Sequence, residues 1–365
     1  MADGLVCHTL NPRLFVDQLA FIASDAGDSW LMIDVDLVSL AEALVPRVPS
    51  IQSVIVLTSR AHMPSKTTLP RVLCYEDLLS AVAAPDLRSF TWAATDENAP
   101  AALCYTSGTT GNPKGVCYSH RSQTLHSMAV CTPDALGLAS QDVVLMVVPI
   151  FHANGWSIAS AAPLAGSRLV LPGNRLDGAS VYGLLERRRV TLTAAVPTVW
   201  MGLLTHLQST PSLRLSSLQR VVIGGAAVPE SMLRSFEEVY GVRVCHAYGL
   251  TETSPLMTLN NAKGAVPRTA AQKLMQGRAM FTVELRLVDD DGRELPWDGR
   301  TSGNLQTRGA GVIRRYFKNA GGVSFNGDWF DTGDVATIDA HGFVQICDRK
   351  KVRELPYHGL PRHCC

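Results

Sequence analysis

Short apolar segments rich in β-branched residues alternate with longer helical segments over most of the chain, and this alternation restricts the possible folds more than any other feature. The short segments have the length of buried strands, and they lie at residues 53–57, 142–148, 192–196 and 218–225. Helical periodicity covers residues 119–138 and 229–240, and the second of these opens with a proline beside an acid. Apolar strands separated by helices are typical of parallel sheets joined by crossovers. We therefore expect an α/β body.

The pattern changes after about Met280. The segments TVELRLVDDDGREL (282–295) and VATIDAHGFVQIC (335–347) alternate apolar and polar residues around Asp-Gly and His-Gly turns, which is typical of antiparallel hairpins. We expect an α/β body over residues 1–280, a smaller β-rich part over 281–351 and an unstructured tail over 352–365. The tail has two prolines, two histidines and no apolar periodicity.

Composition and charge exclude several classes of protein. The chain has 365 residues, of which 46% are hydrophobic and 18% are charged, as in globular proteins. A formal net charge of +1 gives no electrostatic attraction for nucleic acid or for an anionic membrane. The longest apolar run, at residues 143–151, is too short to cross a bilayer, so we expect no transmembrane segment.

The cysteines and the first residues indicate the compartment. The nine cysteines form no CxxC pair and no cysteine–histidine spacing suited to zinc. Isolated cysteines of this kind are usually small buried residues in a reducing environment. The N-terminal residues carry an early acid and lack the charged-then-apolar pattern of a signal peptide. These features favour a cytoplasmic protein.

The stretch YTSGTTGNPKG (105–115) combines three glycines with several hydroxyl residues and one lysine. Since we expect a strand at 102–106 and a helix at 119–130, the stretch should lie near a strand-to-helix passage, where backbone N–H groups can converge on an anion. Its glycines allow close approach of the main chain, and Lys114 supplies a charge suited to phosphate. The composition therefore favours a phosphate-binding loop.

This loop differs from a Walker A motif. That motif places its lysine directly after the second glycine and follows it with Ser or Thr. Here Pro113 precedes Lys114 and Gly115 follows it, so a standard P-loop is excluded. A surface loop is the plainer interpretation of such a composition.

Five segments, in order, resemble the core motifs of the adenylate-forming enzymes, the superfamily of acyl-CoA synthetases, luciferases and peptide-synthetase adenylation domains. They are YTSGTTGNPKG (105–115), PIFHANGW (149–156), GGAAVP (224–229), AYGLTETSP (247–255) and WFDTGDVATIDAHGFVQICDRKK (329–351). The resemblance implies layered parallel-sheet subdomains plus a smaller antiparallel β-rich subdomain, without the family's mobile C-terminal domain. It also implies activation of a carboxylic acid by ATP to give acyl-AMP and pyrophosphate, followed by capture by the thiol of coenzyme A. Mg²⁺ is the implied metal, and a homodimer is compatible with the family.

The resemblance further implies roles for single residues. The phosphate-contacting set would be Thr106, Ser107, Gly108, Thr109, Thr110, Gly111 and Lys114. Thr251 would bond the α-phosphate, and Glu252 would ligate magnesium. Tyr248 would stack on adenine, while Asp334 and Arg349 would bind the ribose hydroxyls, a task suited to a carboxylate acceptor.

The acyl side of the site is implied in the same way. His152 resembles the residue that lines the acyl channel near the reacting carboxylate. Gly225 and Ala226 would contact the nucleotide and, with Trp156 and Gly224, shape the acyl pocket, because small residues leave room for a chain.

Plainer interpretations exist for four of these residues. Glu252 could be a solvated charge, Tyr248 a core tyrosine and Asp334 a turn residue. His152 could be a packed histidine rather than a substrate-orienting one.

Three segments most resemble those of medium- and long-chain fatty acyl-CoA synthetases: HTLNPRLF (8–15), FHANGW (151–156) and AYGLTETSP (247–255). Peptide-synthetase domains usually have a proline where Leu250 stands, which disfavours that branch. Luciferase-type oxygenation shares the adenylation step and stays open, and so does the acyl chain length.

Two differences from the family pattern concern the ends. The family usually has a longer stretch before the phosphate loop, and after DRKK (348–351) it continues into a hinge and a mobile domain with a catalytic lysine. Here VRELPYHGLPRHCC (352–365) follows instead. We therefore expect an acid–thiol ligase by lineage whose turnover is impaired. The alternatives are a non-catalytic protein that binds the adenylate and a chain without a stable function.

Overall fold

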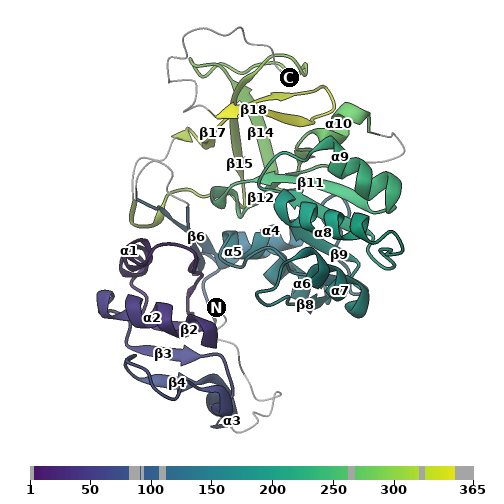
Figure 1. Cartoon of the computed structure of the whole chain (residues 1–365). Helices are drawn as coiled ribbons and strands as arrows, with labels where there is room; N and C mark the ends of the chain where they lie inside the picture. Colours follow the sequence, from purple (N-terminus) through teal and green to yellow (C-terminus); the bar gives the residue numbers. More distant parts are fainter. Residues whose placement is uncertain are drawn as a thin grey trace, which may run out of the picture.

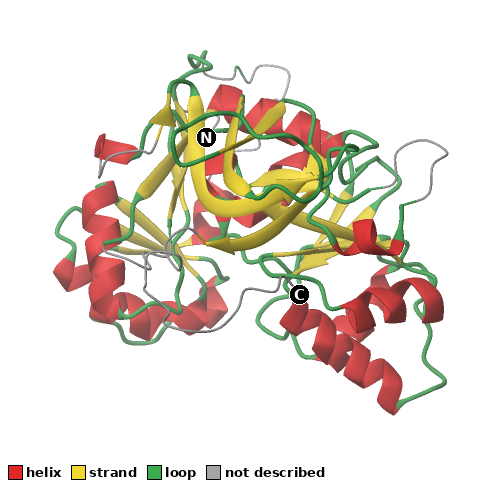
Figure 2. Cartoon of the chain, turned by 90° about the horizontal axis from the view of Figure 1, so that it is seen from above, coloured by secondary structure: helices red, strands yellow, loops and turns green. Residues whose placement is uncertain are grey.

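The computed structural model describes residues 4–81, 91, 94–106, 112–261, 268–319 and 325–349 (Figure 1). These residues form four β-sheets. Seen from above, the strands lie toward the centre of the molecule and helices lie around them (Figure 2). The mixture of parallel and antiparallel sheets confirms the predicted α/β class with a smaller antiparallel part.

The first sheet belongs to the N-terminal part, at the lower left of Figure 1. Its order is β2-β3-β4, all parallel, and its strands are β2 (Trp30–Ile33), β3 (Ser53–Val56) and β4 (Val72–Cys74). Its helices are α1 (Val16–Ala26), α2 (Val38–Leu44) and α3 (Tyr75–Ala81). Leu19 of α1, Leu44 of α2 and Val54 of β3 share one buried cluster. The strand predicted at 53–57 is confirmed.

A three-stranded sheet carries the ends of the glycine-rich stretch. Its order is β1-β5-β6, with β1 (Cys7–His8), β5 (Pro100–Tyr105) and β6 (Gly115–Ser119). Strands β5 and β6 pair antiparallel, with Tyr105 opposite Gly115. The expected strand-to-helix passage is therefore wrong: the stretch closes a hairpin, and α4 (His120–Cys131) begins only after β6. The five residues of β6 are too few to give a clear periodicity.

Helix α4 confirms the helix predicted at 119–130, whereas the longer range of 119–138 is wrong. Ser119 caps the helix by accepting a hydrogen bond from Ser122 N. At the other end Thr132 is extended, with ψ of 149°. Pro133 follows it, and a residue before proline is disfavoured in the helical region. The proline therefore ends the helix.

The central sheet has seven strands in the order β13-β12-β11-β10-β9-β7-β8, and the five from β11 to β8 are parallel. Its strands are β7 (Val143–Leu145), β8 (Arg168–Val170), β9 (Leu192–Ala195), β10 (Arg220–Gly224), β11 (Arg243–Gly249), β12 (Leu256–Leu259) and β13 (Arg278–Ala279). The strands predicted at 142–148, 192–196 and 218–225 are confirmed in shorter form.

Both faces of this sheet are buried. Val221 and Ile223 of β10 lie in one core cluster, whereas Val222 lies in the other. Neighbouring residues of a strand point to opposite faces, so both faces are covered, as in other parallel sheets. The helices that accompany the sheet are α5 (Ala153–Trp156), α6 (Ile158–Leu164), α7 (Gly178–Arg188), α8 (Pro197–Ser209), α9 (Glu230–Arg234) and α10 (Ala270–Leu274).

The helix predicted at 229–240 is confirmed with a difference in its winding. Helix α9 passes directly into a π-helical turn at Ser235–Val239. Pro229 occupies the N-cap position instead of the first turn, with an extended ψ of 138°.

The fourth sheet, at the top of Figure 1, is antiparallel. Its strands are β14 (Val283–Val288), β15 (Gly303–Gly309), β16 (Phe325–Asn326), β17 (Trp329–Ile338) and β18 (Val344–Arg349). The β17–β18 hairpin predicted around the His-Gly turn is confirmed. Around the Asp-Gly turn, β14 makes one bridge with Glu294 and pairs mainly with β15. All five strands follow Met280, where we predict the boundary.

Short 3₁₀ turns complete the described elements, at Val35–Leu37, Val45–Arg47, Arg60–His62, Thr251–Thr253 and Phe317–Asn319. Within the described residues, every helix is too short or too polar to cross a membrane. The predicted tail at 352–365 lies outside the described residues.

Candidate functional site

Three strands from two sheets bring Tyr248, Asp334 and Arg349 together. Tyr248 on β11 donates a hydrogen bond from its hydroxyl to Oδ2 of Asp334 on β17. Arg349 Nε, on β18, lies 2.6 Å from Asp334 Oδ1. That contact lacks hydrogen-bond alignment, and Oδ1 is buried without a hydrogen-bond donor among the described residues. One carboxylate oxygen therefore keeps its capacity to accept.

The protonation of this cluster follows from its burial. The Asp334 side chain is 1% exposed, and burial raises the pKa of its carboxyl, while the Tyr248 hydroxyl and Arg349 act in the opposite direction. Burial, and then the Asp334 carboxylate, raise the pKa of Tyr248 well above its ordinary value. Tyr248 therefore stays a hydrogen-bond donor at neutral pH.

The Thr251–Thr253 turn follows β11 and is held by two tyrosines. Tyr118 of β6 donates to the Thr251 carbonyl oxygen at 2.6 Å. Tyr316 donates to Glu252 Oε1 at 2.7 Å. Burial and the Glu252 carboxylate raise the pKa of Tyr316, so its hydroxyl keeps its hydrogen. The Glu252 carbonyl also accepts a bond from Ile313 N at 2.9 Å. The turn is therefore fixed on both its backbone and its side-chain face.

Lys114 reaches the same place from the end of the glycine-rich stretch. Its Nζ lies 4.9 Å from the centroid of the Tyr316 ring, whose hydroxyl contacts Glu252. Thr106 N donates to Lys114 O at 2.9 Å, and Lys114 N donates to Thr106 Oγ1 at 3.1 Å. These bonds close the base of the loop beside the Glu252 turn. The predicted residues Ser107, Gly108, Thr109, Thr110 and Gly111 lie outside the described residues.

A left-handed turn follows His152. All five residues from 153 to 157 have positive φ, between 37° and 71°, which is unusual for residues other than glycine. Asn154 fastens the turn: its N–H donates to Cys104 Sγ at 3.3 Å and its Nδ2 to Thr9 Oγ1 at 3.2 Å. Contacts with Thr9, just after β1, and with Cys104 of β5 thus support the strained backbone.

His152 itself is exposed at the surface beside this turn, although neighbouring atoms partly desolvate its ring. Its ring lies 4.8 Å from that of Phe151. This desolvation, and then the charge of Arg13, lower the pKa of His152. The imidazole is therefore neutral at pH 7.

Trp156 packs against two glycines at the end of β10. A Cβ on Gly224 would lie 3.0 Å from the Trp156 ring and 2.8 Å from the Ala247 carbonyl oxygen. Gly225 has φ of +78°, and Ala226 beside it is exposed. Since β10 and β11 are parallel neighbours, these small residues lie at the same sheet edge as Tyr248. Parallel sheets bind their ligands at this edge.

The structure thus brings those predicted residues that it describes into two adjoining groups, one around Glu252 and Asp334 and one around Trp156. The prediction missed Tyr118 and Tyr316, which hold the Thr251–Thr253 turn. No local pattern could have indicated them, because Tyr118 lies 133 residues from Thr251 in the chain.

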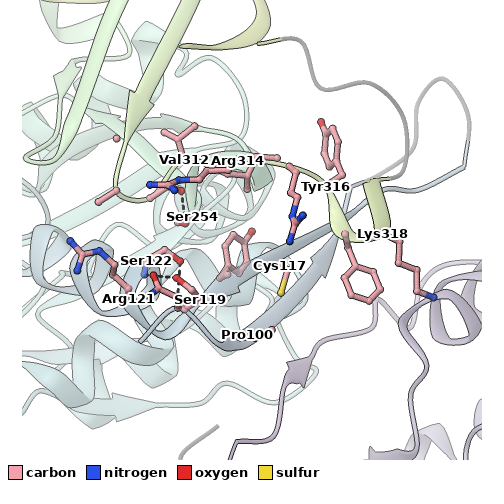
Figure 3. A pocket seen from close by; sticks show the side chains of 18 residues that line it. Pro100, Cys117, Ser119, Arg121, Ser122, Ser254, Val312, Arg314, Tyr316 and Lys318 are labelled. Carbon is pink, nitrogen blue, oxygen red and sulfur yellow. Dashed lines mark hydrogen bonds between the residues drawn. The ribbon is translucent and has the colours of Figure 1, made fainter. Parts of the chain in front are cut away.

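A cavity of about 640 Å³ lies next to Ser254, the residue that follows the Thr251–Thr253 turn (Figure 3). It is lined by β6, the start of α4 and the segment that follows β15, and Tyr118, Ser254 and Tyr316 are among its residues. The cavity lining does not include Tyr248, Asp334 or Arg349. The cavity therefore borders the turn without containing the predicted ribose contacts.

Candidate metal ligands are sparse. In the part of the chain that the structure describes, no group of three or more His, Cys, Asp or Glu side chains could hold a metal ion. Cys74, Cys104 and Cys245 are buried as expected, whereas Cys7 is exposed.

Comparison with known proteins identifies the family. The model of the AMP-binding enzyme family matches residues 1–317. The medium-chain-fatty-acid–CoA ligase of Ectopseudomonas oleovorans is 44% identical over 353 residues, which cover 95% of this chain and 64% of the relative. A 3-methylmercaptopropionyl-CoA ligase of Ruegeria pomeroyi is 45% identical with the same coverage.

A solved structure supports the same family assignment. O-succinylbenzoate coenzyme A synthetase from Bacillus subtilis, in complex with ATP and magnesium ion, superposes with a TM-score of 0.73 and 25% identity, covering 95% of this chain and 64% of that one. The chain thus spans somewhat less than two thirds of the length of these relatives. The resemblance found in the five motifs is confirmed: the chain belongs to the AMP-binding enzyme family.

Proposed function

We propose that this chain provides the nucleotide and acyl sites of an acid–thiol ligase. The reaction joins a carboxylic acid to ATP, giving acyl-AMP and pyrophosphate, and the acyl group then passes to the thiol of coenzyme A. The observation that carries the proposal is the buried Asp334 Oδ1, which lacks a hydrogen-bond donor among the described residues. Arg349 Nε pairs with this oxygen as an ion, but the oxygen accepts no aligned hydrogen bond. A carboxylate oxygen can accept more than one donor, so the hydroxyls of a ribose could bond to it.

The neighbouring groups support a nucleotide in this position. Tyr248, on the same carboxylate, offers a ring face for adenine. Arg349 has a 60% exposed side chain next to Asp334 and could reach the ribose from the solvent side. Gly225 and Ala226 leave the sheet edge open beside them.

Phosphate binding is proposed for Lys114, Thr251 and the loop of residues 106–111. Lys114 lies on the Tyr316 ring next to Glu252, so a cation and a carboxylate share one corner of the site. Mg²⁺ commonly uses one protein carboxylate together with substrate phosphates, and Glu252 fits this requirement through its second oxygen. When bound, the ion would neutralise charge on the phosphates.

The acyl group would lie toward Trp156 and His152. The neutral His152 imidazole can donate or accept a hydrogen bond without adding a charge beside the carboxylate. The relatives named above act on a medium-chain fatty acid and on 3-methylmercaptopropionate, which supports an aliphatic acid as the substrate. We place the protein in the cytoplasm, in keeping with its buried thiols.

ATP–pyrophosphate exchange tests the proposal. The purified chain is incubated with octanoate, Mg²⁺-ATP and labelled pyrophosphate, and AMP binding is measured separately by calorimetry. We expect AMP binding, and exchange that depends on octanoate. Glu252→Gln and Lys114→Met should reduce exchange at least 10-fold without unfolding the chain, because electrostatic groups of this kind contribute roughly 10²–10³ in rate.

Two other outcomes are informative. AMP binding without any exchange would support the non-catalytic alternative. Exchange that both variants leave unchanged would refute the assignment of these residues.

A further inference from the structure

A buried histidine outside the proposed site connects its two halves. His126 on α4 is 1% exposed. Its Nε2 lies 2.9 Å from the carbonyl oxygen of Leu256, and its Nδ1 lies 2.9 Å from Ser157 Oγ. Leu256 follows the turn that carries Glu252, whereas Ser157 ends the left-handed turn that carries Trp156. One imidazole therefore contacts both segments.

Ser157 closes the connection directly. Ser157 is 1% exposed, and its Oγ donates to the Ser254 carbonyl oxygen at 2.8 Å. Ser254 in turn donates from Oγ to Gly311 O at 2.6 Å. Gly311 packs closely here, because a Cβ on it would lie 3.2 Å from the His126 ring and would press on the imidazole. The network thus extends from α4 to the segment that follows β15.

The imidazole hydrogen of this network can be assigned, whereas the hydroxyl hydrogen of Ser157 has two acceptors within reach. Carbonyl oxygens only accept, so the contact with Leu256 places the imidazole hydrogen on Nε2. Burial lowers the pKa of His126 to about 4, so the ring is neutral at pH 7 and Nδ1 is an acceptor. The single Ser157 hydrogen then faces two acceptors, Nδ1 and the Ser254 carbonyl. Ser157 thus links the imidazole of His126 to the backbone at Ser254.

We propose that His126 is a positioning residue that, acting through Ser157, fixes the turn at residues 251–256 relative to the left-handed turn at 153–157. The first turn carries the proposed phosphate and magnesium residues, and the second carries the proposed acyl residue Trp156. The His126–Ser157 contact between the two turns therefore determines the relative positions of the acyl and nucleotide ends of one bound ligand. The inference rests on the proposed function only for the identity of these two halves.

Two probes separate positioning from general stability. AMP occupies the nucleotide half alone, whereas octanoyl sulfamoyl-adenosine, a non-hydrolysable mimic of the acyl-adenylate, spans both halves. We expect His126→Leu to weaken binding of the mimic about 30-fold and binding of AMP less than 3-fold, because a lost buried hydrogen bond misplaces one half relative to the other. Calorimetry on the full chain at pH 7 gives both dissociation constants.

Matched variants sharpen the test. His126→Gln keeps an N–H donor near the Nε2 position and should restore most of the affinity for the mimic. Ser157→Ala should reproduce the effect of His126→Leu. Ser127→Ala is the control: it removes a partly buried hydrogen bond of 2.9 Å between the same helix and Ser160 and leaves the contacts of residues 254–256 in place. It should leave both affinities unchanged.

The contrary results are distinct. Equal loss for both probes, or none in a cooperatively folded His126→Leu variant, would overturn the inference. If the wild-type chain binds neither probe, the proposed function fails, and amide hydrogen exchange then decides the inference by itself. In that case His126→Leu should accelerate exchange in both residues 251–257 and 157–161, and Ser127→Ala should not; an unchanged pattern would refute the positioning role.

Discussion

Tyr316 donates its hydroxyl hydrogen to Oε1 of Glu252 at 2.7 Å, while Lys114 Nζ lies 4.9 Å from the centroid of the same tyrosine ring. One side chain thus orients the carboxylate that we assign to magnesium and supports the lysine that we assign to phosphate. Tyr316 and Glu252 are 64 positions apart in the chain. This arrangement leads to the first prediction.

Tyr316→Phe should remove the donor and keep the ring. We expect the free energy of unfolding to fall by about 1 kcal/mol, the usual net value of one hydrogen bond. The released Glu252 carboxylate can rotate, so more Mg²⁺ should be needed for half-maximal ATP binding. Denaturant unfolding and a magnesium titration of ATP binding measure the two effects.

Tyr182→Phe is the matched control, because Tyr182 lies on α7 and its ring packs on His206 at 5.6 Å, away from the turn. It should leave the magnesium requirement unchanged. A Tyr316→Phe variant with the wild-type requirement would show that the hydroxyl does not orient Glu252.

Asp334→Asn should separate ligand binding from stability. The buried carboxylate carries a desolvation cost that an amide does not, and Tyr248 can still donate to the amide oxygen. Arg349 loses little, because its side chain is 60% exposed. We therefore expect an unchanged or higher melting temperature together with at least 10-fold weaker AMP binding. A variant that melts lower but binds AMP normally would refute the assignment of Asp334 to the ribose.

The same residue predicts a pH dependence. Burial raises the pKa of Asp334 in the folded chain, so it binds its proton at a higher pH than in the unfolded chain. Between the two pKa values the folded state holds more protons, and the contribution of Asp334 to stability therefore falls as pH rises through that window. AMP affinity has the opposite sign, since the carboxylate is the acceptor, and it should fall as the pH is lowered.

Calorimetric titrations of AMP from pH 7 down to pH 4 would measure this dependence. Asp334→Asn should remove the part of it that Asp334 causes. If the wild type and the variant show the same slope, another group controls the binding.

Much of this arrangement could be predicted from the sequence, and the reason differs between its parts. The strand at 220–224 has five consecutive buried residues, because a parallel strand is covered on both faces, and such a run is visible in the sequence. The hairpin that encloses residues 106–114 was not predicted, since its second strand is short and β pairing depends on a partner elsewhere in the chain.

The supporting residues of the site were also missed. His126 has the appearance of an ordinary residue of α4, and only the tertiary structure brings it to Leu256, 130 positions away. Residues such as Asp334 and Glu252 could be singled out as candidates because they lie inside recognisable motifs. The side chains that hold them have no such motif around them.

Gly224→Ala tests the close packing at the end of β10. The added methyl would lie 2.8 Å from the Ala247 carbonyl oxygen and 3.0 Å from the Trp156 ring. One of these neighbours must move, which typically costs 1–3 kcal/mol, and the indole should move more readily than the strand. We expect a lower melting temperature, altered tryptophan fluorescence and weaker octanoate binding with AMP binding largely kept.

Pairing the change with Trp156→Ala should recover only part of the stability, because the contact with Ala247 remains. Gly202→Ala on α8, where the nearest atom would be 3.9 Å away, should be neutral or slightly stabilising. Octanoate binding that survives Gly224→Ala intact would place the acyl group somewhere other than beside Trp156.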